Sequence, residues 1–414
     1  MASFKKNIFF LLILQGSNYL IPLMTLPYLS RVLGVEGFGT YGLVLAVAQY
    51  FILFIDFGYN MTATKKIAEN KHDKKYVSTV FWQTIFSKII LLLISFFILL
   101  IMVLFPFLGG SKFEMLYISI MMIGSIMMPI WLFQGLEDLT KVTVFSVLGK
   151  LFVFPLLFLL VKSENDISLA VFLYSLTYFV SGIIAIYITY KYKFVFWVRP
   201  AVKSMFLSLK ESSGFFLAAF IISLYTVSTP IILSLVSDIE QVSLFSAGDR
   251  VRSAILGVFY ILGGAIYPRV NAIFKEDIRK AYLFIRSVLL IKLVFGLFFG
   301  VVLFIGSKRI SVLIYGAEFY GVADVLMILS FSLIFSLLSV VFSNYILLPL
   351  GHKKEYIALP FFSASIHLLL CSFLGFYYGA IGGAYSILIV EMFTLLALIF
   401  ITNRKVKLAK VVSH

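Results

Sequence analysis

Long apolar stretches, separated by short polar segments, make up most of the chain. The stretch 89–105, for example, contains no charged residue. A membrane-spanning helix needs about 20 mostly apolar residues. On this criterion we predict twelve spans, at residues 8–30, 38–62, 78–105, 114–134, 143–161, 169–190, 213–235, 243–267, 281–306, 321–350, 356–376 and 379–402.

These apolar runs are too long for a transmembrane barrel, whose strands would appear as short segments of alternating hydrophobicity. Helices satisfy their own backbone hydrogen bonds in lipid, so we expect an all-α integral membrane protein. The composition agrees, because 62% of the residues are hydrophobic and 13% are charged, whereas soluble domains have about 25% charged residues. The first stretch follows the basic start MASFKK. It lacks a signal-peptide cleavage site, so we expect it to be retained as a span.

Basic residues are distributed unevenly between the two sides that twelve spans define. An even number of spans places both termini on one side, and that side carries 23 of the 34 Lys and Arg residues, against 5 on the opposite side. By the positive-inside rule both termini are expected in the cytoplasm. The net charge of +15 is then mainly topological. Nucleic acid is therefore not an expected partner.

The longest loop divides the predicted spans into six and six. We expect an N-terminal six-helix lobe at 1–190, a cytoplasmic linker at 191–212, a C-terminal six-helix lobe at 213–402 and a basic cytoplasmic tail at 403–414. Each half has the letters FFL near its start and a proline deep in its first span, Pro22 in one and Pro230 in the other. Interrupted helices at matching places in two halves indicate a transporter binding site. The alternative is that these prolines only kink lipid-facing helices.

Basic residues inside the predicted spans are the first candidate chemistry. A charge at a helix centre costs roughly 2.5–3.5 kcal/mol, and such residues usually face a bundle interior or a water-filled cavity. Some have a simpler interpretation, since Arg286, and in part Lys88 and Lys150, can extend to the nearby interface. Lys292 lies near the middle of its span, where this is difficult. The six are Lys88, Lys150, Arg250, Arg252, Arg286 and Lys292.

Three acidic residues also lie in predicted spans: Asp56, Asp249 and Glu391. Asp249 can pair with Arg252, three residues on along one helix face, and then serve packing alone. Asp56 can likewise bond only to a neighbouring helix. The alternative for all three is that they couple transport to H⁺ or another cation, as carboxylates in transporters often do.

The surplus of cations over acids within the spans favours an anionic cargo, because arginine is suited to bidentate recognition of phosphate. A cofactor is not expected. The single cysteine, Cys371, excludes an intramolecular disulfide and a cysteine-based metal site, and the chain contains no Walker A motif. The candidate substrate-binding residues are Arg31, at the external end of the first span, with Lys88, Arg250, Arg252, Arg286 and Lys292.

Five segments in chain order carry a resemblance to a known family. They read PYLSRVLGVEGFGTYGL (27–43), IDFGYNMTATKKIA (55–68), PIWLFQGLEDL (129–139), FSAGDRVRSAI continuing to AIYPRVNAIFKED (245–277), and YGAIGGAYSILIVEMF (378–393). With the twelve spans, they resemble the Wzx-type O-antigen and polysaccharide flippases of the multidrug/oligosaccharidyl-lipid/polysaccharide (MOP) superfamily. The peptidoglycan-precursor branch of that superfamily has two further C-terminal spans, which this chain lacks.

The resemblance implies a fold and a cargo. Two six-helix lobes would alternate access around a central cavity. The cargo would be an undecaprenyl-pyrophosphate-linked oligosaccharide, moved from the cytoplasmic to the periplasmic leaflet of the bacterial inner membrane. The implied partners are this lipid-linked oligosaccharide, the bilayer, H⁺ or another coupling cation, and a polysaccharide polymerase machinery.

Two other classes of function are open. A cation-coupled multidrug exporter of the same superfamily would need an acidic or neutral aromatic cavity. The predicted spans of this chain instead contain six basic residues and three acidic ones. A polyprenyl-linked glycan-processing enzyme would be expected to show a D-x-D metal site or a large external loop, and the sequence has neither. His367 is the one histidine within a span, and we expect it to be packed or hydrogen-bonded. We therefore expect a transport protein and not an enzyme.

Overall fold

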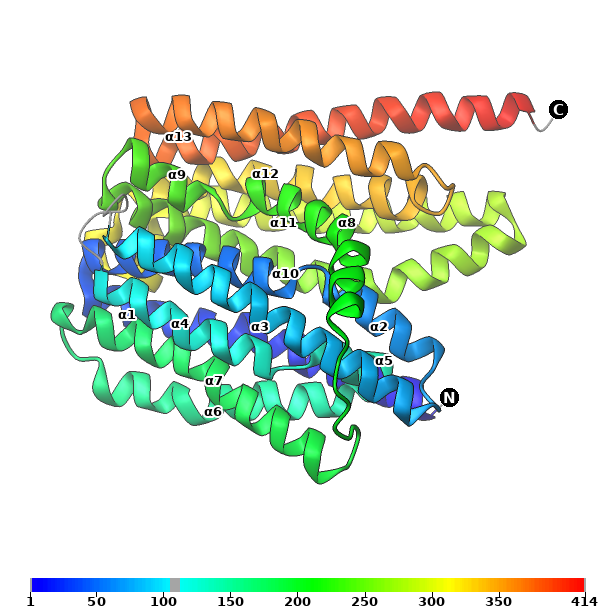
Figure 1. The fold of residues 1–414 in the computed structure, drawn as a ribbon. Helices are drawn as coiled ribbons and strands as arrows, with labels where there is room; N and C mark the ends of the chain where they lie inside the picture. The colour runs from blue at the N-terminus through cyan, green and yellow to red at the C-terminus, as the bar shows by residue number, and fades with distance from the viewer. Residues whose placement is uncertain (1, 105–111, 413–414) are drawn as a thin grey trace. The chain divides into compact units, whose positions relative to one another are not determined.

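The computed structural model describes residues 2–104 and 112–412, and these residues form helices and turns without a strand (Figure 1). The end of the third predicted span and the last two residues of the predicted tail lie outside them. A 3-10 turn occurs at Glu164–Asp166 and at Ala317–Phe319, and a π-helix at Ser343–Leu347. The α-helices are α1 (Ala2–Asp56), α2 (Tyr59–Glu69), α3 (Lys74–Leu104), α4 (Lys112–Met127), α5 (Ile130–Gly135), α6 (Leu139–Leu160), α7 (Ile167–Lys191), α8 (Val202–Thr226), α9 (Thr229–Val236), α10 (Ile239–Glu276), α11 (Ile278–Tyr315), α12 (Val322–Phe342) and α13 (Lys353–Val412).

Each predicted span falls on one helix or on two consecutive helices. Glycines with positive φ interrupt the two longest helices, Gly34 (65°) in α1 and Gly379 (53°) in α13. Within the described residues, nine helical stretches are long and apolar enough to cross a membrane. Two of them, Met24–Glu69 and Lys354–Lys405, have 46 and 52 residues, about twice the length of a span. The all-α membrane fold is therefore confirmed.

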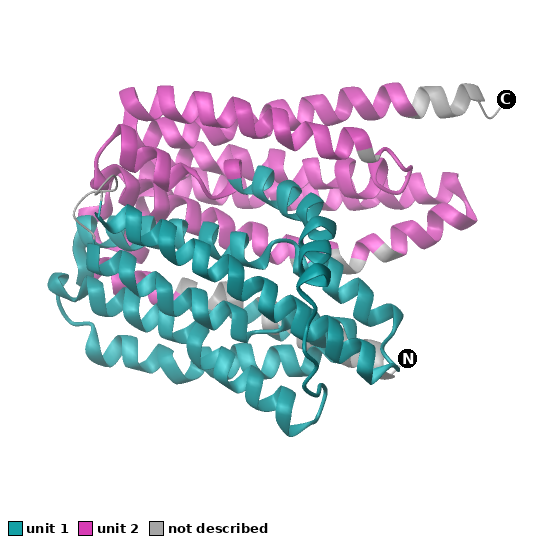
Figure 2. Ribbon diagram, viewed as in Figure 1, with its two compact units in different colours: residues 1–21, 32–223 teal, residues 22–31, 224–414 magenta. Residues whose placement is uncertain are grey.

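The chain forms two compact units (Figure 2). Unit 1 comprises residues 1–21 and 32–223, and unit 2 comprises residues 22–31 and 224–414. The segment 191–212, predicted as a linker, belongs to unit 1. The predicted lobes, 1–190 and 213–402, and the tail at 403–414 stay predictions.

In unit 1, α4 and α7 cross where two glycines allow their backbones to approach. A Cβ on Gly124 would lie 2.5 Å from the backbone nitrogen of Phe179, and a Cβ on Gly182 would lie 2.6 Å from the Cβ of Met127. Small residues permit such close helix packing in membranes, where burial of apolar surface does not drive association. Beside this pair, a core surrounds Trp131, whose side chain is fully buried.

In unit 2, α12 packs against α10, α11 and α13. α13 turns back on itself at Gly379, so that Ser363 on its first half and Thr394 on its second half lie 2.8 Å apart, hydroxyl to hydroxyl. Gly382 permits this hairpin, since a Cβ there would collide with the carbonyl oxygen of Leu374. Residues of α10, α12 and the second half of α13 are thereby brought together.

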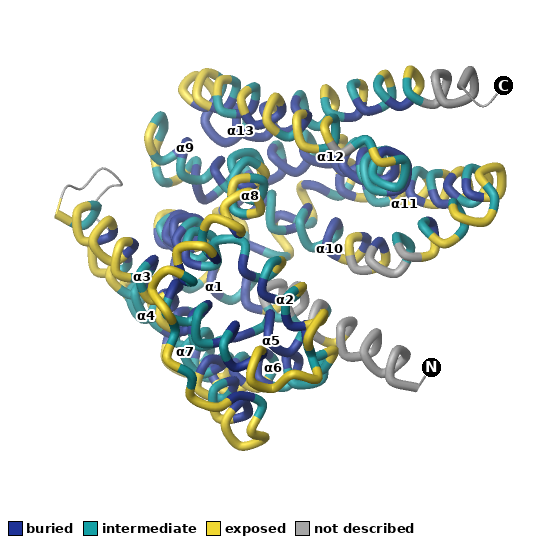
Figure 3. Tube along the Cα trace, turned by 45° about the vertical axis from the view of Figure 1, so that its right-hand side comes forward, coloured by how far each residue is buried: buried dark blue, intermediate teal, exposed yellow. Residues whose placement is uncertain are grey.

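The long helices have many exposed residues (Figure 3), and large apolar side chains are common among them. On α3, Leu93, Phe97 and Leu104 are exposed, and on α11 so is Ile305. Large exposed apolar surfaces mark contact with a membrane or another protein. Because these helices are long and apolar enough to cross a membrane, we expect these surfaces to face lipid.

The α4–α7 crossing generates a stability prediction. We expect Gly124→Ala to lower the thermal unfolding midpoint of the purified protein in detergent, because overpacking typically costs about 1–3 kcal/mol. Gly214→Ala is the control, since nothing lies within 4 Å of a Cβ there. Alanine favours the helix over glycine by up to ~1 kcal/mol, so this variant should be unchanged or more stable. Equal midpoints for the two variants would contradict the packing described for Gly124.

Candidate functional site

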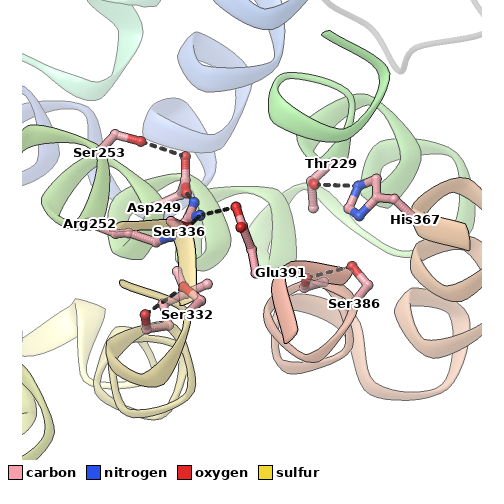
Figure 4. A network of polar contacts seen from close by, with 11 residues as sticks. Thr229, Asp249, Arg252, Ser253, Ser332, Ser336, His367, Ser386 and Glu391 are labelled. Carbon is pink, nitrogen blue, oxygen red and sulfur yellow. Dashed lines mark hydrogen bonds and ion pairs between the residues drawn. The ribbon is translucent and has the colours of Figure 1, made fainter. Parts of the chain in front are cut away.

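A charged cluster in unit 2 joins three helices (Figure 4). Arg252 on α10 donates from Nη1 to Asp249 Oδ1 at 2.8 Å, one turn earlier on the same helix. Its Nη2 donates to Glu391 Oε1 on α13 at 3.3 Å and to Ser336 Oγ on α12 at 3.3 Å. The pairing of Asp249 with Arg252 that the spacing predicted is confirmed, and Glu391 is a second acidic partner.

The three charged side chains of this cluster are largely buried, so each needs a partner of opposite charge. Arg252 is 8% exposed, and the side chains of Asp249 and Glu391 are 23% and 16% exposed. An isolated charge in this environment would be strongly unfavourable, and its partners offset that cost. The guanidinium thus has two carboxylate partners, one on its own helix and one on α13.

A second polar contact in unit 2 involves His367 on the first half of α13. His367 is fully buried, and its Nε2 lies 3.1 Å from Thr229 Oγ1 on α9. Figure 4 shows this pair and Ser386 near Glu391. Ser386 itself donates to the carbonyl of Gly383 at 2.7 Å. The expectation that His367 is packed and hydrogen-bonded is confirmed.

Unit 1 contains its own buried ion pair. Asp56 ends α1, and the chain then turns through Phe57 and Gly58, with φ of 43° and 81°. Lys88 on α3 is 1% exposed and donates to Asp56 Oδ1 at 2.5 Å, and Asn60 donates to Asp56 Oδ2 at 3.1 Å. Lys88 therefore bonds to an acid instead of extending to the interface. Asp56 bonds to a neighbouring helix, as its alternative interpretation predicted.

Lys292 differs from these residues. It lies in the middle of α11 with 4% exposure, and within the described residues its Nζ has no hydrogen-bond partner. The ammonium lies 5.2 Å from the ring centroid of Tyr345. Tyr345 belongs to the π-helix Ser343–Leu347 and donates its hydroxyl proton to the carbonyl of Gly263 at 3.3 Å. A cation over an aromatic face is only partly compensated for its lost hydration. Lys292 is thus a buried cation in need of hydrogen-bond acceptors.

The remaining predicted cations lie in more open positions. Arg31 is exposed and donates from Nη2 to the carbonyl of Leu313 at 2.7 Å. Arg250 is half-buried, and Arg286 is exposed, in agreement with the expectation that it extends to the interface. The structure therefore brings together Asp249, Arg252 and Glu391 in one cluster, and Asp56 with Lys88 in another.

The sequence reasoning did not identify the polar partners of these charges. Asn60 stands only four residues after Asp56, but the two lie on opposite sides of the turn at Phe57 and Gly58, so helical spacing does not predict their contact. Ser336 and Thr229 carry no distinguishing local signal among many serines and threonines. Tyr345 is placed by a π-helix, which no hydrophobic pattern in the sequence predicts.

Comparison with solved structures identifies the fold. A MATE family multidrug resistance transporter of the MOP superfamily, in its inward-facing conformation, aligns with a TM-score of 0.76 and 16% identity, covering 98% of this chain and 100% of that one. The lipid II flippase MurJ, in its inward closed conformation, aligns with a TM-score of 0.69 and 14% identity, covering 96% and 86%. At these identities the likeness shows the fold alone. The chain is a multi-pass membrane protein with this fold.

Sequence comparison identifies the family. Residues 4–274 match the family described as "Polysaccharide biosynthesis protein". A protein of Escherichia coli (strain K12) named "Putative O-antigen transporter" is 33% identical over 407 residues, 97% of this chain and 98% of the relative. A protein of the same name in Shigella dysenteriae is 30% identical over 394 residues, 95% and 98% of the two chains. The chain therefore belongs to the polysaccharide biosynthesis protein family, and the predicted resemblance is confirmed.

The charged cluster of unit 2 generates a second stability prediction. We expect Arg252→Met to destabilise the protein by about 3–5 kcal/mol, because it leaves two carboxylates buried without their cation. Replacing these as well, in the triple variant Asp249→Asn/Arg252→Met/Glu391→Gln, should recover most of the loss. Arg286→Met, at an exposed site, should change stability by less than about 1 kcal/mol.

Thermal unfolding of the purified variants in detergent checks this order. If the triple variant were as unstable as Arg252→Met, the ion pairs would not be the reason for the loss.

Proposed function

We propose that this protein is a flippase for an undecaprenyl-pyrophosphate-linked oligosaccharide, an O-antigen repeat unit or a similar glycan. It moves this cargo from the cytoplasmic to the periplasmic leaflet of the bacterial inner membrane, with both of its own termini in the cytoplasm. Two relatives of nearly full length are named as O-antigen transporters, and neither is named as an enzyme. The fold is also that of a protein named as a lipid flippase.

The observation that carries the proposal is the buried, hydrogen-bond-deficient ammonium of Lys292. A pyrophosphate supplies several strong acceptor oxygens and the opposite charge. In a site of low dielectric constant, such an interaction is far stronger than in water. Tyr345 contacts the ammonium through its ring face, which offers no hydrogen-bond acceptor of the kind that a phosphate supplies. An anionic headgroup thus provides what this side chain lacks.

We assign different roles to the predicted cations, according to whether each has an acidic partner. The charge of Lys88 is balanced by Asp56, and that of Arg252 by Asp249 and Glu391. We therefore place the pyrophosphate at Lys292. Arg250 and Arg31 carry it toward the external mouth, and Arg286 meets it near the cytoplasmic side. The sugar moves through a hydrated cavity by alternating access while the lipid tail stays in the bilayer.

Coupling to H⁺ or another cation belongs to the cluster of Asp249, Arg252 and Glu391. Two carboxylates share one guanidinium there, so Glu391 can accept a proton while Asp249 keeps the ion pair. Asp56 has less freedom, because it is the acid bonded to the almost fully buried Lys88. The membrane potential adds about 2.3 kcal/mol per charge per 100 mV in favour of the anion outside. A polysaccharide polymerase machinery receives the cargo.

A multidrug exporter is the second candidate, because the highest TM-score given above is to a MATE family transporter. Such a protein would bind cationic drugs. The Lys292 ammonium argues against a multidrug exporter, because it has no acidic partner among the described residues and would repel a cationic drug.

The first functional prediction concerns Lys292. In a host deleted for this gene, the lipid-linked oligosaccharide should accumulate in the cytoplasmic leaflet, and the wild-type gene should release it. At equal membrane levels, Lys292→Met should slow release on the order of tenfold to hundredfold, the effect of losing one charge-assisted contact. Lys292→Arg should retain more activity.

The stability of the same variant separates binding from folding. Lys292→Met removes an uncompensated buried charge, so its unfolding midpoint should equal or exceed that of wild type. Arg286→Met serves as the surface control. If Lys292→Met released the oligosaccharide at the wild-type rate, Lys292 would not be the pyrophosphate site. Normal crossing in the deletion host, with other flippases removed, would refute the function itself.

The second functional prediction concerns coupling. In proteoliposomes, Glu391→Gln should abolish the response of flipping to an imposed pH gradient and leave the gradient-free rate within about threefold of wild type. Asp56→Asn is the comparison, and it should keep the response. If Glu391→Gln kept the full response to the pH gradient and Asp56→Asn lost it, the coupling residue would be Asp56 in unit 1.

A further inference from the structure

The segment that precedes the seventh predicted span has an unusual charge. Five basic residues lie within 191–212, and Glu211 is its one acid. Glu211 already pairs with Lys66 on α2. Within the described residues, Lys203 and Lys210 have no acidic partner within 4.0 Å and both are exposed. The segment therefore presents uncompensated positive charge, on the side that the distribution of basic residues predicts to be cytoplasmic.

The first eleven residues of α8 have two different faces. Met205, Ser208 and Ser212, spaced by three and four residues, are buried. The other face carries Val202, Phe206 and Leu207, which are 66%, 62% and 52% exposed, flanked by Lys203 and Lys210. This alternation has the helical period, with an inner face packed on the protein and an outer face that is apolar and basic.

The inner face is firmly held to unit 1. Ser212 Oγ lies 2.6 Å from Thr62 Oγ1 on α2, and Ser204 Oγ accepts a hydrogen bond from Gln83 on α3 at 3.0 Å. Gly58 allows this approach, because a Cβ there would lie 2.7 Å from the carbonyl of Ser212. The face that needs a partner is thus the outer one.

An exposed aromatic residue also lies in the loop that precedes α8. Trp197 is 60% exposed and packs edge-on against Trp82 with 4.4 Å between ring centroids. The indole of Trp82 donates to the carbonyl of Phe196 at 2.9 Å. Tryptophan gathers at membrane–water interfaces, where its ring meets apolar chains and its N–H meets polar groups.

The direction of this part of α8 differs from that of a span. In Figure 1, α8 begins across the long axes of the other unit 1 helices and then turns to run along them. The eleven residues before the predicted span reach roughly 16 Å, about half the thickness of the hydrocarbon core. They cannot cross a membrane but can lie along one.

We propose that residues 196–210 form an interfacial anchor that binds anionic phospholipid headgroups of the cytoplasmic leaflet. Phe206, Leu207 and Trp197 enter the boundary between headgroups and acyl chains, and Lys203 and Lys210 contact the phosphates above them. An exposed helix face that mixes bulky apolar side chains with lysines is the pattern of helices that lie in the membrane interface. Charge complementarity selects anionic over zwitterionic headgroups.

Site-directed spin labelling tests the anchor. The sole cysteine, Cys371, is buried and is replaced in a Cys371→Ser background. A nitroxide is attached at Phe206→Cys, and the full chain is placed in phosphatidylcholine nanodiscs with or without phosphatidylglycerol. We expect phosphatidylglycerol to raise the ratio of oxygen to nickel-chelate collisions several-fold. Lys203→Glu/Lys210→Glu should abolish that rise.

The control reverses two lysines elsewhere on the same predicted side. Lys74→Glu/Lys75→Glu changes the net charge equally, at exposed positions outside the anchor, and should keep the rise. A label that stays open to the nickel chelate in both lipids would overturn the proposal and assign the face to a protein partner. If the label were equally protected from the nickel chelate in both lipids, and charge reversal did not change this, the segment would lie in the membrane without selecting anionic headgroups.

Discussion

The structure depends on one constraint, the cost of holding a charge away from water. Lipid offers no hydrogen bonds, so a chain that places ionisable groups in membrane-spanning helices must supply their partners from other helices. Lys88 on α3 reaches Asp56 at the end of α1, and Arg252 on α10 reaches Asp249, Ser336 and Glu391. These contacts fix the register of the helices they join. The hairpin of α13 and its close contact at Gly382 are what bring Glu391 to that position.

Lys292 is an exception to this pairing of buried charges. The same chain that pairs Lys88 and Arg252 leaves the Lys292 ammonium with an aromatic face and no hydrogen bond among the described residues. A cation in this state lowers stability, and proteins break such local rules mainly at functional sites. The π-helix that carries Tyr345 is a second departure from regular structure at the same place, and π-bulges frequently occur at functional sites.

The helical fold was predictable from the sequence because the bilayer limits the choice of structure, and apolar runs of sufficient length can only be helices. The pairing of Asp249 with Arg252 was predictable for a local reason, since residues three apart share a helix face. Glu391, 139 positions from Arg252, was recognised as an intramembrane acid but could not be assigned to this arginine. Long-range partners depend on how helices pack, and serines and threonines at such contacts look like those elsewhere. The early start of α8 was also missed, because its first turns are amphipathic and fall outside any apolar run.

The fold does not determine the cargo. The sign of the buried, unpaired charge is what distinguishes a cationic drug from an anionic lipid as the ligand. Transporters of drugs and a flippase of a lipid share this architecture with the present chain, and one fold commonly serves several functions. A site for a cationic drug must offer negative charge or aromatic faces without a competing cation. The described interior instead balances its carboxylates with Lys88 and Arg252 and retains Lys292 without an acid beside it. The proposed cargo fits this arrangement, because the pyrophosphate on its lipid carrier is an anion, and an anion would compensate the charge of Lys292.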